Sequence, residues 1–150
     1  ENINVRNSYD VINRLCNVKL CADETLASFD AVSMFASIFI SLILETISRK
    51  WNKFQPFTPI NKDSFTKAVK LRVEKGYCRY NDAFYSQIEG VAMGSPLSAI
   101  VTELVLDQLF SDIASKFDVK FCVKYVDDSL FILKKSIIQD VPNFMNNFQS

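Results

Sequence analysis

The sequence contains no histidine, and this absence limits the chemistry that the chain can perform. Ser-His-Asp and Cys-His hydrolases are excluded, and so is a histidine general base. The four cysteines show no CxxC spacing, and no histidine is present to complete a zinc set. We therefore expect the cysteines to be small apolar fillers in a reducing compartment, and any catalysis to depend on carboxylates, lysines, tyrosines or metal ions.

Glycine and proline are also scarce, with three and four residues in a chain of 150. The sequence has no linker, low-complexity tract or internal repeat. Its hydrophobic content of 49%, with 13% aromatic residues, is ample for a core. We expect one compact unit over residues 1–150.

Long apolar runs are missing as well. The longest weakly polar run, residues 31–44, contains three serines and is shorter than the ~20 apolar residues that span a bilayer. We expect this run to be buried core. The start of the sequence shows no signal-peptide pattern, so secretion is not expected.

The chain has no net charge, with 17 basic and 17 acidic residues, which fits poorly with nucleic-acid binding by counterion release. The average conceals a pattern. Residues 47–75 contain eight basic and two acidic residues, whereas residues 76–150 contain six basic and nine acidic residues. A basic face opposite an acidic pocket would suit a polymerase, and a solvated helical surface would give the same pattern. Both interpretations stay open.

The apolar periodicity predicts alternating helices and strands. Helices are predicted over residues 9–19, 38–51, about 61–75, 96–114 and 141–148. A strand is predicted over residues 25–29, and hairpins over 77–80 with 83–88 and over 119–126 with 129–133. This order indicates an α+β fold with a small antiparallel sheet packed on helices.

Three acidic residues lie at strand ends. Asp127 and Asp128 are adjacent at the tip of an apolar hairpin, and Asp30 follows the first predicted strand. Neighbouring carboxylates repel one another unless a cation lies beside them. Mg²⁺ prefers oxygen ligands of this kind, and two metal ions about 3.5–4 Å apart can promote in-line phosphoryl transfer. Asp pairs are also common in ordinary turns, but here two apolar strands deliver the pair, which favours a metal site.

Three blocks of sequence carry a family resemblance. Residues 28–35 are SFDAVSMF, residues 87–98 are QIEGVAMGSPLS, and residues 124–128 are KYVDD. In this order they resemble the palm motifs of reverse transcriptases, most closely the SFDVVSLF, QxxGxAMGSPLS and RYVDD blocks of Penelope-like retroelements. The resemblance covers nearly the whole chain.

This resemblance implies the palm of an RNA-directed DNA polymerase, with fingers and thumb largely missing. The implied reaction joins a dNTP to a primer 3′-hydroxyl with two Mg²⁺ ions, or Mn²⁺ in their place. Asp30 and Asp127 would be the principal metal ligands and Asp128 a supporting one, and all three would be catalytic. The implied metal site also includes Ala31.

The resemblance assigns further positions to the nucleotide. The implied substrate-binding residues are Ser33, Met34, Phe35, Gln87, Met93 and Gly94. The implied motif-supporting residues are Gly90, Ser95, Pro96, Tyr125 and Val126. Phe35 would stack under the incoming sugar and exclude a 2′-hydroxyl, unless it is an ordinary core residue.

The implied partners are an RNA template, a DNA primer and dNTP, with no membrane. The implied location is intracellular and nuclear, because the element must reach chromosomal DNA, and the oligomeric state stays unknown. We do not expect this fragment to polymerise alone.

Two alternatives remain, namely an inactive relic or domesticated palm that binds nucleic acid or a protein partner, and a structural α+β domain whose acids cap turns. In the second alternative Asp30 would lie more than about 8 Å from Asp127.

Overall fold

A computed structural model describes residues 3–148, which divide into two compact units. Unit 1 contains residues 3–32 and 109–148, and unit 2 contains residues 33–108. The chain passes from one unit to the other after Val32 and again inside a long helix. Composition predicted one compact unit, because neither crossing is rich in glycine or proline.

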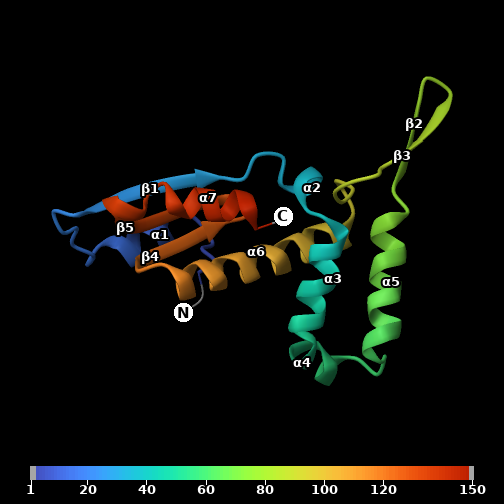
Figure 1. Ribbon diagram of the computed structural model, residues 1–150, viewed down its shortest axis with the longest axis horizontal. Coiled ribbons are helices and arrows are strands. Elements are labelled where there is room, and N and C mark those ends of the chain that lie inside the picture. The colour runs from blue at the N-terminus through green and yellow to red at the C-terminus, as the bar shows by residue number, and fades with distance from the viewer. Residues whose placement is uncertain (1–2, 149–150) are drawn as a thin grey trace. The chain divides into compact units, whose positions relative to one another are not determined.

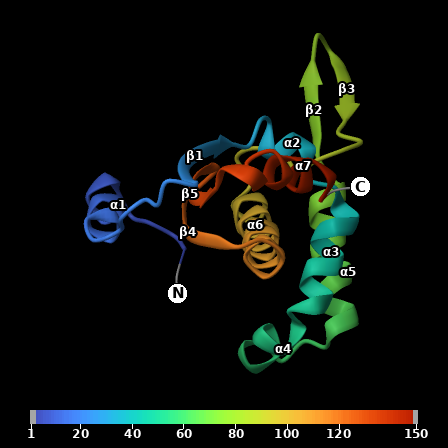
Figure 2. The same cartoon turned by 60° about the vertical axis from the view of Figure 1, so that its left-hand side comes forward.

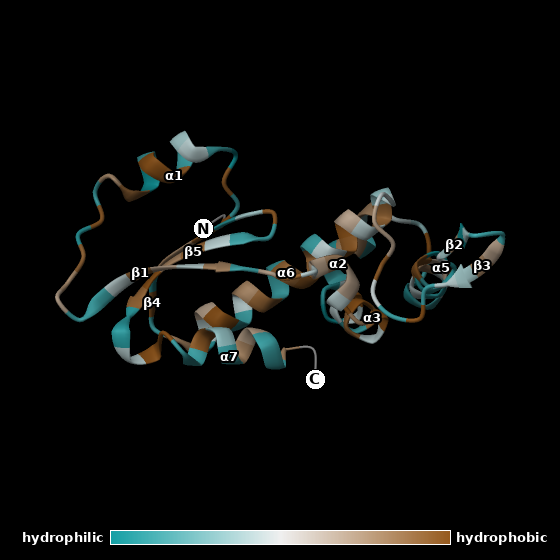
Figure 3. Cartoon of the chain, turned by 90° about the horizontal axis from the view of Figure 1, so that it is seen from above, coloured by the Kyte–Doolittle hydropathy of each residue, from teal (hydrophilic) through white to brown (hydrophobic). Residues whose placement is uncertain are grey.

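Unit 1 is built on a three-stranded antiparallel sheet. Its strands are β1 (Glu24–Asp30), β4 (Val119–Tyr125) and β5 (Asp128–Lys134), in the order β1-β5-β4 (Figure 1). Its helices are α1 (Ser8–Leu15), η2 (Lys135–Ile137), α7 (Asp140–Asn147) and the end of α6 (Pro96–Lys116). Helix α1 lies on one side of the sheet, and α7 and the end of α6 lie on the other (Figure 3).

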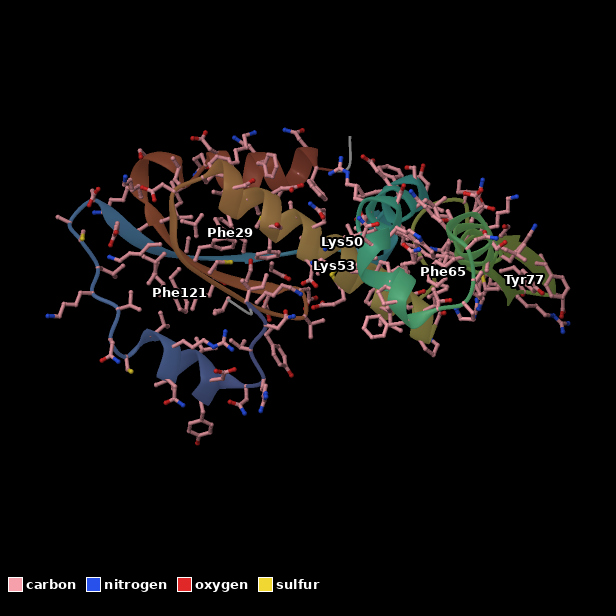
Figure 4. The ribbon with its side chains drawn as sticks, turned by 90° about the horizontal axis from the view of Figure 1, so that it is seen from below. Phe29, Lys50, Lys53, Phe65, Tyr77 and Phe121 are labelled. Atoms are coloured by element: carbon pink, nitrogen blue, oxygen red, sulfur yellow. The ribbon has the colours of Figure 1, made fainter. Side chains whose placement is uncertain are left out.

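The core of unit 1 forms on the α6 side of the sheet. Phe131 in the central strand is fully buried, and its ring stacks on Phe110 of α6 with centroids 5.6 Å apart. Phe29 of β1 meets the same ring edge-on at 5.5 Å. Phe121 of β4 lies on the opposite side of the sheet from Phe29 (Figure 4). The aromatic cluster therefore joins β1, β5 and α6.

Unit 2 is mainly helical. Its helices are α2 (Met34–Ser37), α3 (Ile40–Arg49), α4 (Trp51–Phe54), η1 (Gln55–Phe57), α5 (Lys62–Glu74) and the first part of α6. Helices α3 and α5 pack side by side (Figure 1). Asn61 caps the N-terminus of helix α5, and its side chain accepts a hydrogen bond of 2.9 Å from the Ser64 amide. Trp51 and Phe54 pack against Phe65 of α5, with ring centroids 5.4 and 6.3 Å away.

A hairpin follows α5 and consists of β2 (Tyr77–Tyr80) and β3 (Ala83–Ser86). Both turn residues have positive φ, 51° at Asn81 and 62° at Asp82. Two successive positive φ angles are typical of a type I′ turn, for which Asn and Asp are favourable residues. The predicted hairpin over this segment is confirmed.

The mixed helix and antiparallel-sheet fold is also confirmed, although several predicted boundaries are wrong. The helix predicted over residues 38–51 begins only at Ile40, because Ile38 is extended. It is interrupted at Lys50, which leaves the helical region at φ −93°, ψ 8°. The first helix ends at Leu15, and Val18 instead closes a turn by donating to the Leu15 carbonyl. Apolar spacing by itself predicts a helix through all of these positions.

The cysteines are not the buried fillers that composition predicted. Cys16, Cys21 and Cys78 are exposed, and only Cys122 in β4 is partly buried. Burial raises the pKa of the Cys122 thiol to about 12, because the thiolate would lose its hydration. Exposure of the other three follows from their positions after α1, before β1 and in the β2–β3 hairpin.

The weakly polar run over residues 31–44 is core only in part, because Val32 is 81% and Phe39 41% exposed. Ile38 and Ile43 are 2% and 0% exposed. Within residues 3–148, no helix combines the length and the apolar character needed to cross a bilayer.

Replacing Phe131 by alanine tests the aromatic core of unit 1. We expect the free energy of unfolding to fall by about 3–5 kcal/mol, because the change leaves a cavity between Phe29 and Phe110. Phe57→Ala is the matched control, since Phe57 is 89% exposed, and its effect should stay within about 0.5 kcal/mol. Urea unfolding followed by near-ultraviolet circular dichroism measures both. Equal losses would contradict this description of the core.

Candidate active site

Strand pairing brings two of the three predicted catalytic acids together. Strands β1 and β5 pair from Glu24 opposite Lys134 to Asp30 opposite Asp128. Directly opposed residues of an antiparallel pair point to the same face, with Cβ atoms about 4.5–5.5 Å apart. Asp30 and Asp128 are both exposed. Two carboxylates remote in sequence thus lie side by side at one end of the sheet.

Strand β4 extends this arrangement. Tyr125 is opposite Asp128, so Asp30, Asp128 and Tyr125 form a row across the three strands. Side chains alternate along a strand, so this row lies on the face away from Phe131 and α6. Asp127 is in the turn itself and is exposed. The carboxylates are therefore open to solvent and carried by strands whose other face is packed.

The turn that carries Asp127 is strained. Val126 and Asp127 connect Tyr125 to its partner Asp128, and Val126 has φ 58°. A β-branched residue rarely adopts positive φ, and the first central position of such a two-residue turn usually holds glycine. Strain of this kind costs on the order of 1–3 kcal/mol and clusters at functional sites. Sequence reasoning missed this strain. The available signal was a two-residue connection between strands that contains neither glycine nor asparagine.

Behind the acids, a second row of residues fixes the strands. Ser129 is buried, and its hydroxyl donates a hydrogen bond of 2.8 Å to the Phe29 carbonyl, which ties β5 to β1. Lys124 pairs with Ser129 in register and is only 1% exposed. Sequence reasoning assigned no role to either residue. The available signal was that Lys124 lies on the same face of β4 as Cys122, which faces Phe131 across the sheet.

The acids supply donors that suit a hard metal ion. Among residues 3–148, no group of three or more His, Cys, Asp or Glu side chains is arranged to hold a metal. The site therefore offers the Asp30–Asp128 pair, with Asp127 in the adjacent turn. Mg²⁺ is commonly held by one or two protein carboxylates, with water and substrate phosphates filling the other positions. The donor chemistry of the pair fits Mg²⁺ or Mn²⁺ on this basis.

In unit 2, the first and second sequence blocks meet. The Val91 amide donates a hydrogen bond of 2.7 Å to the Phe35 carbonyl. Gly90 has φ 73°, and a Cβ atom there would lie 2.6 Å from the Ala36 carbonyl oxygen. Only glycine fits this close approach. Gly90 therefore lets the second block pack against the segment that carries Phe35.

The residues around Phe35 differ in exposure. Ser33 precedes α2 in the left-handed region at φ 54°, and it is exposed. Met34 is 8% exposed and belongs to the core of unit 2. Phe35 is half-buried. Of this group, Ser33 and Phe35 present surface that a ligand could contact.

The second block opens onto a hollow of about 610 Å³. Gln87, Met93, Gly94 and Ser95 all line it, and Pro96 begins α6 directly after them. Met93 is 75% exposed, and the space around the Gly94 Cα is open. The Ser95 hydroxyl is buried without a hydrogen-bond partner among the described residues. The structure thus gathers four predicted residues in one depression.

The predicted residues fall into two groups, one in each unit. Unit 1 holds the residues of the first strand end and the hairpin tip, namely Asp30, Ala31, Tyr125, Val126, Asp127 and Asp128. Unit 2 holds the residues at the start of α2 and those of the second block, namely Ser33, Met34, Phe35, Gln87, Gly90, Met93, Gly94, Ser95 and Pro96.

Comparison with known proteins gives a likeness in structure. No protein-family model matches the sequence, and no curated protein matches it. Apo telomerase from Candida tropicalis is similar at a TM-score of 0.72 and 14% identity, over 97% of this chain and 29% of that chain. The same telomerase truncated from its C-terminal domain is similar at a TM-score of 0.63 and 16% identity, over 97% and 32% of the two chains.

These likenesses concern the fold. The chain has a mixed helix and antiparallel-sheet fold that matches part of these telomerase chains, which fits the partial polymerase fold that its sequence blocks predicted. It spans about a third of the telomerase chains that it matches.

Gly90→Ala tests the contact between the two blocks of unit 2. We expect a loss of about 2–4 kcal/mol in the free energy of unfolding, because the added Cβ meets backbone atoms at a residue that already has positive φ. Gly76→Ala is the matched control, since a Cβ there meets its nearest atom at 3.5 Å, an ordinary contact. Urea unfolding measures both variants. A loss for Gly76→Ala as large as that for Gly90→Ala would refute the explanation.

Proposed function

We propose that this chain is the palm part of an RNA-directed DNA polymerase of a retroelement, similar to Penelope-like elements. The observation that carries the proposal is the pairing of Asp30 with Asp128 inside a reverse-transcriptase-like fold. In the proposed reaction, a primer 3′-hydroxyl attacks the α-phosphate of a dNTP opposite an RNA template, and pyrophosphate leaves.

The three carboxylates would hold two divalent ions, Mg²⁺ or Mn²⁺. When bound, such ions activate the attacking hydroxyl and stabilise the leaving oxygen. The sequence blocks make Asp30 and Asp127 the principal ligands and Asp128 a supporting one, and the register adds that Asp128 lies directly opposite Asp30. Ala31 follows Asp30 and would offer its backbone carbonyl. The buried hydrogen bond from Ser129 to Phe29 holds the two strands in position.

Unit 2 would contact the nucleotide. Phe35 would lie under the sugar, where a rigid ring excludes a 2′-hydroxyl. Met93 is exposed, and its flexible thioether packs on any base without reading its identity. The open space at Gly94 allows close approach of a base pair to the backbone. RNA template, DNA primer and dNTP are the partners in this proposal, and the nucleus is the proposed location.

Metal binding by this chain is a test that does not depend on catalysis. We expect Mn²⁺ at about ten times its dissociation constant to raise the melting temperature by a few degrees, because the ion binds only the folded state. Asp30→Asn should raise the metal-free melting temperature slightly, since it removes one of two opposed like charges. The same variant should lose the Mn²⁺ effect.

Asp118→Asn is the matched control for metal binding. Asp118 is exposed and forms an ion pair of 2.7 Å with Lys134. This variant should keep the Mn²⁺ effect, as measured by differential scanning calorimetry. A Mn²⁺ effect that survives Asp30→Asn would show that the ion binds elsewhere.

Primer extension tests the reaction itself. In a complete version of the enzyme that contains this chain, Asp30→Asn and Asp127→Asn should each abolish dNTP incorporation on a primed RNA template while the circular dichroism spectrum stays unchanged. Asp140→Asn is the control and should extend normally, because Asp140 begins α7 away from the paired acids. Substantial incorporation by the first two variants would exclude the proposed mechanism. A folded wild type with no incorporation would favour an inactive palm that binds nucleic acid.

A further inference from the structure

The β2–β3 hairpin exposes an unusual number of aromatic rings. Every residue from Tyr77 to Ser86 is exposed, including Tyr77 at 73%, Tyr80 at 72%, Phe84 at 74% and Tyr85 at 52%. The hairpin extends beyond the end of α5 (Figure 2). A two-stranded hairpin is marginally stable by itself, and exposed rings in one cluster indicate an interaction surface.

The register places rings on both faces of the hairpin. Tyr77 and Phe84 lie on one face with Arg79, whose guanidinium group is 6.0 Å from the Phe84 ring centroid. Tyr80 and Tyr85 lie diagonally on the other face. Each face therefore offers flat rings at a spacing of about 7–8 Å, suited to planar ligands that stack.

The hollow at the base of the hairpin adds positive charge. Arg72 and Lys75, at the end of α5, line it beside Tyr77 and Tyr85, and none of its lining residues is acidic. An anion is favoured in a depression that contains cations and no carboxylate. Tyr77 is labelled at the hairpin in Figure 4. Two cationic residues and two exposed tyrosines, one from each face of the hairpin, therefore line one depression of unit 2.

We propose that this hollow and hairpin bind one single strand of nucleic acid. Arg72 and Lys75 contact phosphates, and the rings of Tyr77 and Tyr85, which lie on opposite faces of the hairpin, stack on bases as the strand passes around its base. Positive grooves combined with aromatic platforms bind single strands in this way, because every base has a π-face. A duplex keeps its bases stacked on each other and cannot use the rings. That the strand is the polymerase template rests on the proposed function, whereas the binding itself does not.

Fluorescence anisotropy with fluorescein-labelled 12-mers tests the proposal on the 150-residue chain. The probes are single-stranded RNA, single-stranded DNA and a DNA duplex of one sequence, in EDTA and without dNTP, so the carboxylate site plays no part. We expect single strands to bind at least tenfold more tightly than the duplex. The RNA and DNA arms identify which strand is preferred.

Two double variants separate charge from stacking. Arg72→Gln with Lys75→Gln should weaken single-strand binding about tenfold and reduce the magnitude of the salt slope by about 1.4, the value for two phosphate contacts. Tyr77→Leu with Tyr85→Leu keeps apolar bulk, and should weaken binding at least tenfold with the salt slope unchanged. Lys53→Gln and Phe57→Leu are the controls, since both residues are exposed and outside the hollow.

The outcomes distinguish this proposal from the polymerase proposal. Strand binding at this hollow would be overturned if both double variants kept wild-type affinity, or if their losses only equalled those of the controls. Equal affinity for duplex and single strands would overturn it as well. Incorporation of dNTP by the polymerase could still occur in that case. Strand binding as expected, together with no primer extension, would overturn the polymerase and leave a nucleic-acid-binding surface.

Discussion

The pairing of β1 with β5 is the interaction on which the candidate active site depends. It places Asp30 opposite Asp128, and a slip of one residue would move every side chain of a strand to the other face. The register is held from behind the acids, where Ser129 bonds the Phe29 carbonyl and Phe131 is buried against two other rings. Packing on one face therefore determines where charge gathers on the other.

The same end of the sheet concentrates unfavourable features. Two like charges face each other across the strands, and Val126 holds a backbone angle that suits glycine. Both the charge repulsion and the backbone strain lower the stability of the fold. The buried strands on either side of the turn offset both costs, and a bound cation would remove the repulsion between Asp30 and Asp128.

The basic segment over residues 47–75 had two interpretations, a nucleic-acid-binding face and a solvated helical surface, and its residues divide between them. Arg49 forms an ion pair with Glu45 on the surface of α3, as a solvated helix would. Arg72 and Lys75 instead line the hollow beside exposed rings. The segment therefore combines ordinary helix surface with a positive patch, and composition could not separate them because both residue types serve both purposes.

The sequence by itself determined the element types, the Asn81-Asp82 turn and the order of the three blocks, because these follow from local periodicity and turn chemistry. It also predicted Asp30 and Asp128 at strand ends. Only the tertiary structure decided that these two oppose each other, since register is set by contacts between distant strands. The division into two units, the burial of Lys124 and the close approach at Gly90 depend likewise on packing between segments that sequence does not place side by side.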